Sequence, residues 1–60
     1  MEENDRYERV IIDGVLVAAI WFDLEDRDWN IEILAGEEKG ESYSLLDSRE
    51  EALEMAREVL

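Results

Sequence analysis

Residues 7–24 read YERVIIDGVLVAAIWFDL, and within them Asp13-Gly14 separates two runs of β-favouring residues. An Asp-Gly dipeptide between such runs is typical of a type I′ turn, because both central residues of that turn need a positive φ angle. The runs are rich in Val, Ile, Trp and Phe, which pack well on a pleated surface. This stretch therefore predicts a β-hairpin with strands at residues 7–12 and 15–24.

A third strand is expected directly after this hairpin. Residues 23–28 are polar and should turn the chain, and residues 29–33 (WNIEI) then alternate apolar with polar side chains. Such alternation is typical of a half-buried strand, and it places Trp29, Ile31 and Ile33 on one face. Residues 35–42 contain two glycines and three glutamates and read as a loop, and residues 43–46 are expected to form a short fourth strand.

The C-terminal segment carries the signals of a helix. Ser48-Arg49-Glu50-Glu51 matches a capping box, in which Ser48 accepts from the Glu51 N–H and Glu51 accepts from the Ser48 N–H. The helix should run from Arg49 to near Leu60. Its apolar stripe consists of Ala52, Leu53, Ala56, Val59 and Leu60, with Met55 at the edge.

The expected fold is therefore α+β, with one C-terminal helix packed on one face of a three- to four-stranded antiparallel sheet, in the order β-β-β-(β)-α. The 60 residues suffice for a single small domain, in which residues 1–5 are expected to fray.

The second predicted strand is apolar on both sides, which has a consequence for function. Strict alternation would place Val15, Val17, Ala19 and Trp21 on one face. One helix of this length covers one face of a sheet, and a face open to water should carry alternating polar residues. These four residues are therefore predicted to form an apolar interface, in a homodimer or with another partner. The alternative is that the segment around Tyr7 or the loop around Glu37 folds over that face.

The charge balance excludes several function classes. The chain has 18 Asp and Glu against 6 Lys and Arg, a net charge of −12, and it has neither Cys nor His. Disulfides, Cys/His zinc sites and Ser–His catalysis are excluded by composition, and direct nucleic-acid binding is disfavoured because that affinity depends on cations. The longest apolar run, residues 15–22, is too short to cross a bilayer. We expect a non-enzymatic chain without a cofactor. We also expect it in the cytoplasm, because a chain without cysteine fits a reducing compartment in which disulfides are rare.

The acidic residues are predicted to bind a basic protein partner. On a helix, Glu50, Glu54 and Glu58 form one column, although like charges at this spacing repel. A surface this acidic attracts cationic partners and competes with nucleic acid for a basic groove. The predicted contact residues are Asp23, Glu25, Asp26, Asp28, Glu50, Glu54 and Glu58. The alternatives are a solvated helix face and a small acidic homodimer of a halophile, whose charge serves solubility.

A calcium-binding hairpin is a further hypothesis. Asp26, Asp28 and Asn30, with Glu37 eleven residues after Asp26, follow the ligand spacing of an EF-hand loop. The sixth position, which should be Gly, is Ile31, and the flanks read as strands. The same residues are therefore also explained by an acidic hairpin loop.

Residues 21–60 resemble the N-terminal domain of HicB-like antitoxins. The residues that carry the resemblance are Asp26 and Asp28 in the acidic turn, Trp29 in the next strand, Gly36 or Gly40 in the loop, and the capped helix at residues 48–53 (SREEAL), which continues through Ala56-Arg57-Glu58. The resemblance implies a small sheet-and-helix fold and an acidic antagonist that masks a basic RNA-binding partner.

Overall fold

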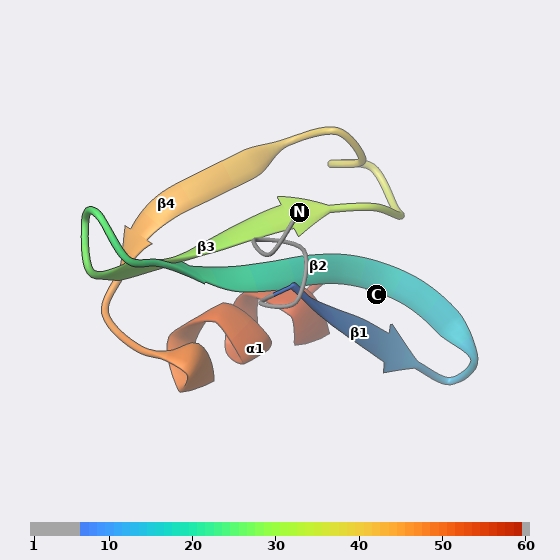
Figure 1. Cartoon of the computed structure of the whole chain (residues 1–60). Coiled ribbons are helices and arrows are strands. Elements are labelled where there is room, and N and C mark those ends of the chain that lie inside the picture. Colours follow the sequence, from blue (N-terminus) through green and yellow to red (C-terminus); the bar gives the residue numbers. More distant parts are fainter. Residues whose placement is uncertain (1–6, 60) are drawn as a thin grey trace.

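A computed structural model describes residues 7–59 of the chain. Four strands form one antiparallel sheet in the order β1-β2-β3-β4: β1 (Glu8–Ile12), β2 (Val15–Asp23), β3 (Asp28–Ile33) and β4 (Ser42–Leu46). The helix α1 (Arg49–Arg57) packs on one face of this sheet, mainly against β2 and β3 (Figure 1). The predicted α+β fold is confirmed, including the fourth strand. The expectations for residues 1–5 and Leu60 concern positions outside the described residues.

The β1–β2 hairpin forms as its turn sequence predicts. Asp13 has φ 53° and Gly14 has φ 80°, the pair of positive angles that a type I′ turn requires. The turn brings Ile12 opposite Val15 and starts the antiparallel register.

The core lies between the sheet and α1. Ile20, Ile31 and Ile33 are buried from the sheet, and Ala52 and Ala56 are buried from the helix. The small alanines let the helix backbone approach the sheet closely, while Leu53, Met55 and Val59 pack at the margins of the core. Trp29 also packs against this core, so the predicted shared face of Trp29, Ile31 and Ile33 is confirmed. No helix within residues 7–59 is long and apolar enough to span a membrane.

A β-bulge in the first hairpin corrects the predicted face of strand β2. Val10 pairs with Ala18 but Ile11 pairs with Leu16, so Val17 is an extra residue without a partner on β1. A bulge of this kind lets two consecutive side chains turn to the same side. Val17 and Ala18 are accordingly both fully buried in the core under α1. The expectation that Val15, Val17, Ala19 and Trp21 share one uncovered face is therefore wrong.

The face away from the helix is less apolar than strand β2 alone suggested. Ala19 and Trp21 remain on it, but Ala19 pairs with Arg9 on one side and with Glu32 on the other. The Tyr7 ring stacks on Trp21, with ring centroids 4.7 Å apart. The segment at Tyr7 thus covers part of this face, as one of the two alternatives expected, and a dimer through the face stays a prediction.

Candidate protein-binding surface

Two side-chain contacts fix the start of α1. The Ser48 hydroxyl accepts a hydrogen bond from the Glu51 N–H at 3.2 Å, as the capping box predicts. The Glu51 carboxylate accepts from the Asp47 N–H at 2.9 Å rather than from the Ser48 N–H. The reciprocal bond thus reaches one residue further back than expected, and both contacts stabilise the first turn.

The glutamate column predicted on the helix is present on its solvent side. Glu50, Glu54 and Glu58 are exposed, whereas Ala52 and Ala56 on the opposite side of α1 are buried. At about 1.5 Å per residue, neighbouring glutamates of this column are about 6 Å apart along the helix axis. We call Glu50, Glu54 and Glu58 the helix column.

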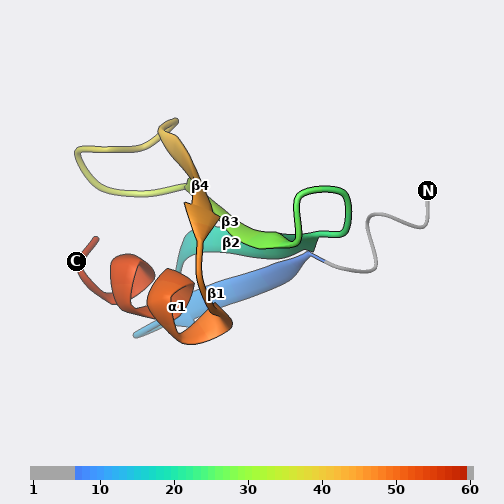
Figure 2. The ribbon, with the colours of Figure 1, turned by 90° about the vertical axis from the view of Figure 1, so that its left-hand side faces the viewer.

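The helix column ends at a groove that the sequence did not reveal. The groove has a volume of about 620 Å³ and lies between the C-terminal end of α1 and the β3–β4 loop. Its apolar lining includes Ile33, Met55 and Val59, and its acidic lining consists of Glu37, Glu38 and Glu58. In Figure 2 the loop and the C-terminal end of the helix both lie on the left, opposite the β2–β3 turn. We call this feature the acidic groove.

Local contacts hold the loop that forms the acidic groove. Gly36 has φ 81°, and a Cβ atom there would lie 3.1 Å from a methyl group of Val59, so glycine allows the loop to approach the helix. On the other wall, the Tyr43 hydroxyl donates a hydrogen bond to the Glu38 carboxylate at 3.1 Å. This hydrogen bond, together with the negative charges of Glu38 and Glu41, raises the pKa of Tyr43, which therefore stays a neutral donor. A sequence signal for the groove does exist, since Met55 and Val59 extend the apolar stripe of the helix toward this loop.

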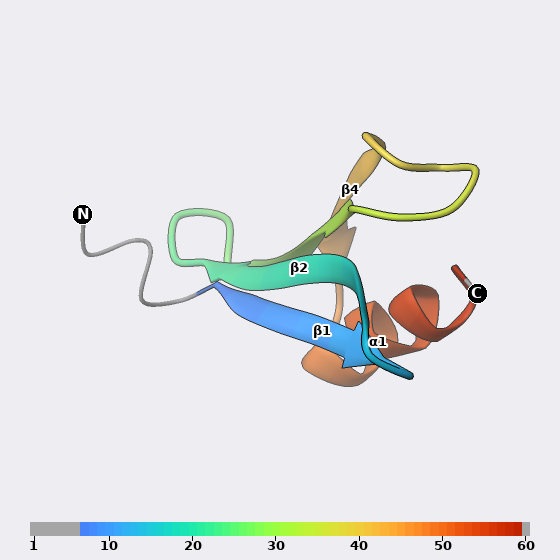
Figure 3. The ribbon, with the colours of Figure 1, turned by 90° about the vertical axis from the view of Figure 1, so that its right-hand side faces the viewer.

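The remaining predicted contact residues form a separate group. Asp23, Asp26 and Asp28 gather at the β2–β3 turn, and we call them the aspartate turn. Glu25 is exposed in the same turn. Figures 2 and 3 show this turn on the side of the molecule away from α1. The seven acidic residues predicted as one partner surface therefore occupy two places.

The predicted calcium ligands do not come together as a set. Asp26 and Asp28 lie in the aspartate turn, and the Asn30 side-chain amide donates to Asp28 at 3.5 Å. Glu37 lies in the loop at the opposite end of β3, where it lines the acidic groove (Figure 1). The EF-hand spacing fails because residues 28–33 form an extended strand instead of curling around an ion.

One of the few cations is already paired. The Nε and Nη2 groups of Arg49 donate hydrogen bonds to the two carboxylate oxygens of Glu8, which joins α1 to the edge strand β1. The hydrogen bond and the positive charge of Arg49 hold the pKa of Glu8 below its ordinary value of 4.5. The pair is exposed and links the two elements.

No protein-family model, curated protein or solved structure shows significant similarity to this chain.

Proposed function

We propose that this chain is a non-enzymatic protein-binding module that masks a basic, nucleic-acid-handling protein. The observation that carries the proposal is the continuity of the helix column with the acidic groove, which share Glu58. Together they form an acidic surface with an apolar floor at one end. The resemblance to HicB-like antitoxins leads to the same class of partner.

The charge of the molecule is on the scale of a nucleic acid. The chain carries a net charge of −12, and its longest dimension is 30 Å. Duplex DNA of that length carries about 18 phosphate charges, at one per 1.7 Å of axis. A basic groove built for a phosphate backbone would therefore attract this surface, and the association would weaken with salt.

The acidic groove suits the side chains of such a partner. Lysine and arginine carry an apolar stem and a charged head, and the stem packs on apolar surface while the head stays at a polar rim. Met55 and Val59 would contact the stem, and Glu37, Glu38 and Glu58 surround the position of the head. Arginine would in addition find carboxylates able to accept two hydrogen bonds at once.

The helix column also has a cost that a purely structural helix could avoid. Glutamates four residues apart repel by about 0.2–0.5 kcal/mol per pair, and Glu58 faces the negative end of the helix dipole. Folding alone would favour lysine at such a position. Recognition of a cationic partner accounts for the carboxylates of Glu54 and Glu58, whereas Glu50 in the first turn also suits the positive end of the helix dipole.

The proposal is tested with two variants of equal net charge. Glu54→Lys combined with Glu58→Lys alters the acidic surface, and Glu32→Lys combined with Asp47→Lys makes the same charge change at exposed positions outside the predicted contact residues. Binding of a fluorescent nine-arginine peptide is measured by anisotropy, and basic proteins are captured from a lysate in low and high salt. We expect at least a tenfold loss of peptide affinity with the first variant and a smaller loss with the second.

The capture experiment adds specificity to this comparison. Nucleic-acid-handling proteins should be retained by the wild type and by the second variant, released by salt, and lost with the first variant. Equal effects of the two variants on both readouts would show that binding follows net charge alone, and the assignment of this surface would be abandoned.

A further inference from the structure

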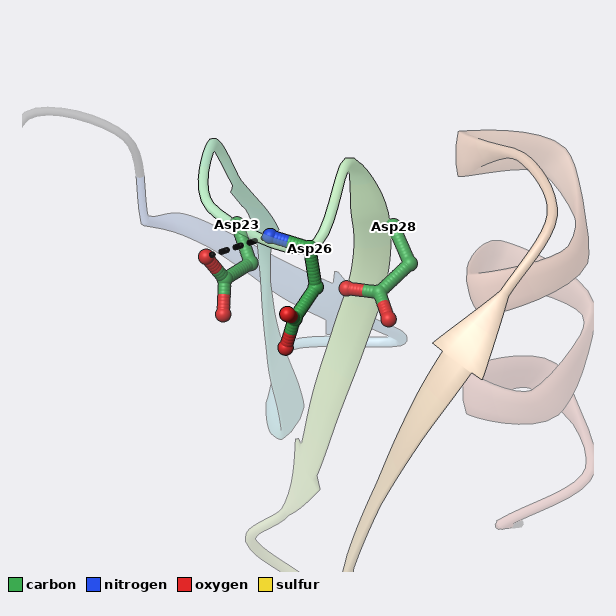
Figure 4. Close-up of side chains that lie close together, drawn as sticks. All are labelled: Asp23, Asp26 and Asp28. Atoms are coloured by element: carbon green, nitrogen blue, oxygen red, sulfur yellow. Dashed lines mark hydrogen bonds between the residues drawn. The ribbon is translucent and has the colours of Figure 1, made fainter.

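We propose that the aspartate turn is a calcium site in which Asp23, Asp26 and Asp28 each supply a carboxylate oxygen. The three oxygens lie within 4.8 Å of one another. Figure 4 shows the carboxylates of Asp23 and Asp26 side by side, with one oxygen of Asp28 directed toward Asp26. This ligand set differs from the EF-hand spacing and does not depend on the proposed protein-binding function.

Asp28 provides an independent reason to place a cation here. Its residue surface is only 9% exposed, and its Oδ2 atom is buried without a hydrogen-bond partner. Its other oxygen accepts only one long hydrogen bond, 3.5 Å from the Asn30 amide. A buried carboxylate oxygen without a donor is unfavourable, because it has lost its water and gained nothing in return. A cation bound in the turn would compensate this buried carboxylate.

The backbone of the turn holds the three carboxylates in place. Asp23 and Asp28 are directly opposite each other where β2 ends and β3 begins, and the Arg27 N–H donates to the Asp23 carbonyl at 2.7 Å. One Asp23 carboxylate oxygen accepts from the N–H groups of Glu25, at 2.9 Å, and Asp26, at 3.4 Å. Like charges directly opposite on neighbouring strands are destabilising. An ion between them would turn this repulsion into attraction.

The coordination preferences of the two ions favour calcium over magnesium at a turn that is open to solvent on one side. Calcium binds oxygen at about 2.3–2.6 Å, so two ligands on opposite sides of one ion lie about 4.8 Å apart. The three carboxylate oxygens meet this limit without rearrangement. Magnesium needs distances of about 2.0–2.1 Å and a nearly ideal octahedron and gives up its water reluctantly, whereas calcium accepts more ligands in a flexible geometry. Water would complete the calcium shell on the exposed side, where Asp26 lies.

Calorimetric titration of the full chain with calcium chloride, in a background of sodium chloride, tests the site. We expect one saturable site per chain, with a dissociation constant of about 10⁻⁴ to 10⁻³ M, the range of sites with few fixed ligands. Magnesium should bind at least tenfold more weakly. At a calcium concentration ten times the dissociation constant, the unfolding equilibrium constant should fall about 11-fold.

Three variants separate this site from general cation attraction. Asp26→Asn and Asp28→Asn should each weaken calcium binding at least tenfold, and Asp26 is exposed, so its variant tests the site even if Asp28→Asn fails to fold. Glu37→Gln, in the loop at the other end of β3, is the matched control and should bind calcium normally. Absence of a saturable site would overturn the proposal. That is the result expected if a water molecule or a proton, rather than a calcium ion, satisfies the Asp28 carboxylate. Equal weakening by Glu37→Gln would overturn it too, because it would indicate diffuse attraction.

Discussion

Replacing Glu58 with lysine should stabilise the fold and weaken partner binding at the same time. Glu58 is the C-cap residue of α1, lies four residues after Glu54 and is exposed. Its carboxylate is repelled by Glu54 and by the negative end of the helix dipole. Lysine at this position reverses both interactions without removing buried surface.

The size of the effect follows from these two interactions. Converting a repulsive pair four residues apart into an attractive one contributes about 0.4–1 kcal/mol, and the order Glu before Lys is the favourable one. Reversing the charge at the end of the dipole contributes about 0.6–2 kcal/mol at low salt. Because the site is exposed, we take the low end and expect a gain of about 1 kcal/mol in the free energy of unfolding. For a domain this small, that gain raises Tm by about 4–8 °C.

Thermal and urea unfolding in low-salt buffer measure this gain. Glu50→Lys is the matched control, since it makes the same charge change in the first turn of the helix. There lysine relieves the repulsion with Glu54 but opposes the positive end of the dipole, so the net change should be close to zero. In about 1 M NaCl, where the Debye length is about 3 Å, the difference between the two variants should shrink.

The binding assay completes this experiment. The more stable Glu58→Lys variant should bind the nine-arginine peptide more weakly than the wild type, because Glu58 belongs to both the helix column and the acidic groove. A Tm that stays equal or falls in low salt would refute the electrostatic account of the helix. A stabilised variant with undiminished peptide binding would refute the role of Glu58 in recognition.

Two glycines give a second prediction. The left-handed backbone at Gly14 and at Gly36 costs an alanine about 1–2 kcal/mol, and the added contact with Val59 should make Gly36→Ala more destabilising than Gly14→Ala in urea unfolding. Equal losses of stability in the two variants would contradict close packing of the loop against the helix. The Glu8–Arg49 pair predicts a pH dependence. Since Arg49 lowers the pKa of Glu8 in the folded state, the pair stabilises the fold above pH 4.5, and this contribution is lost as the pH falls through the lowered value. Glu8→Gln should therefore reduce stability at pH 7 but not at pH 2, and an unchanged urea midpoint at pH 7 would count against the pair. Finally, thermal melts at several salt concentrations should show a folded chain in low salt, whereas unfolding there would indicate that the acidity is a salt adaptation.

Much of the fold is encoded by signals that act over a few residues. Asp13-Gly14 supplies the positive φ angles of the hairpin turn, and Ser48 supplies the helix cap. The alternation of residues 29–33 places their apolar side chains on the core face, as the structure confirms. These features could be predicted because turn geometry, capping and side-chain alternation depend on neighbours along the chain.

Features that depend on pairing between strands could not be predicted in this way. The bulge at Val17 follows from the register of β1 on β2, and the neighbouring residues are all apolar, so their pattern does not mark it. A second bulge lies between β3 and β4, where Leu45 adopts φ 64° although leucine disfavours that region. At this second bulge Leu46 is buried in the core, whereas Leu45 is 75% exposed.

The sequence by itself determined a strongly acidic, cysteine-free chain, its order of strands and helix, and the outward glutamates of that helix. Only the tertiary structure decided which acidic residues meet. The aspartate turn and the helix column lie apart, and Glu37 lies at the opposite end of β3 from the aspartate turn. Glu37 and Glu38 line one groove together with Glu58. The physical reason is that an extended strand moves residues close in sequence far apart, while loop and helix packing brings distant carboxylates together.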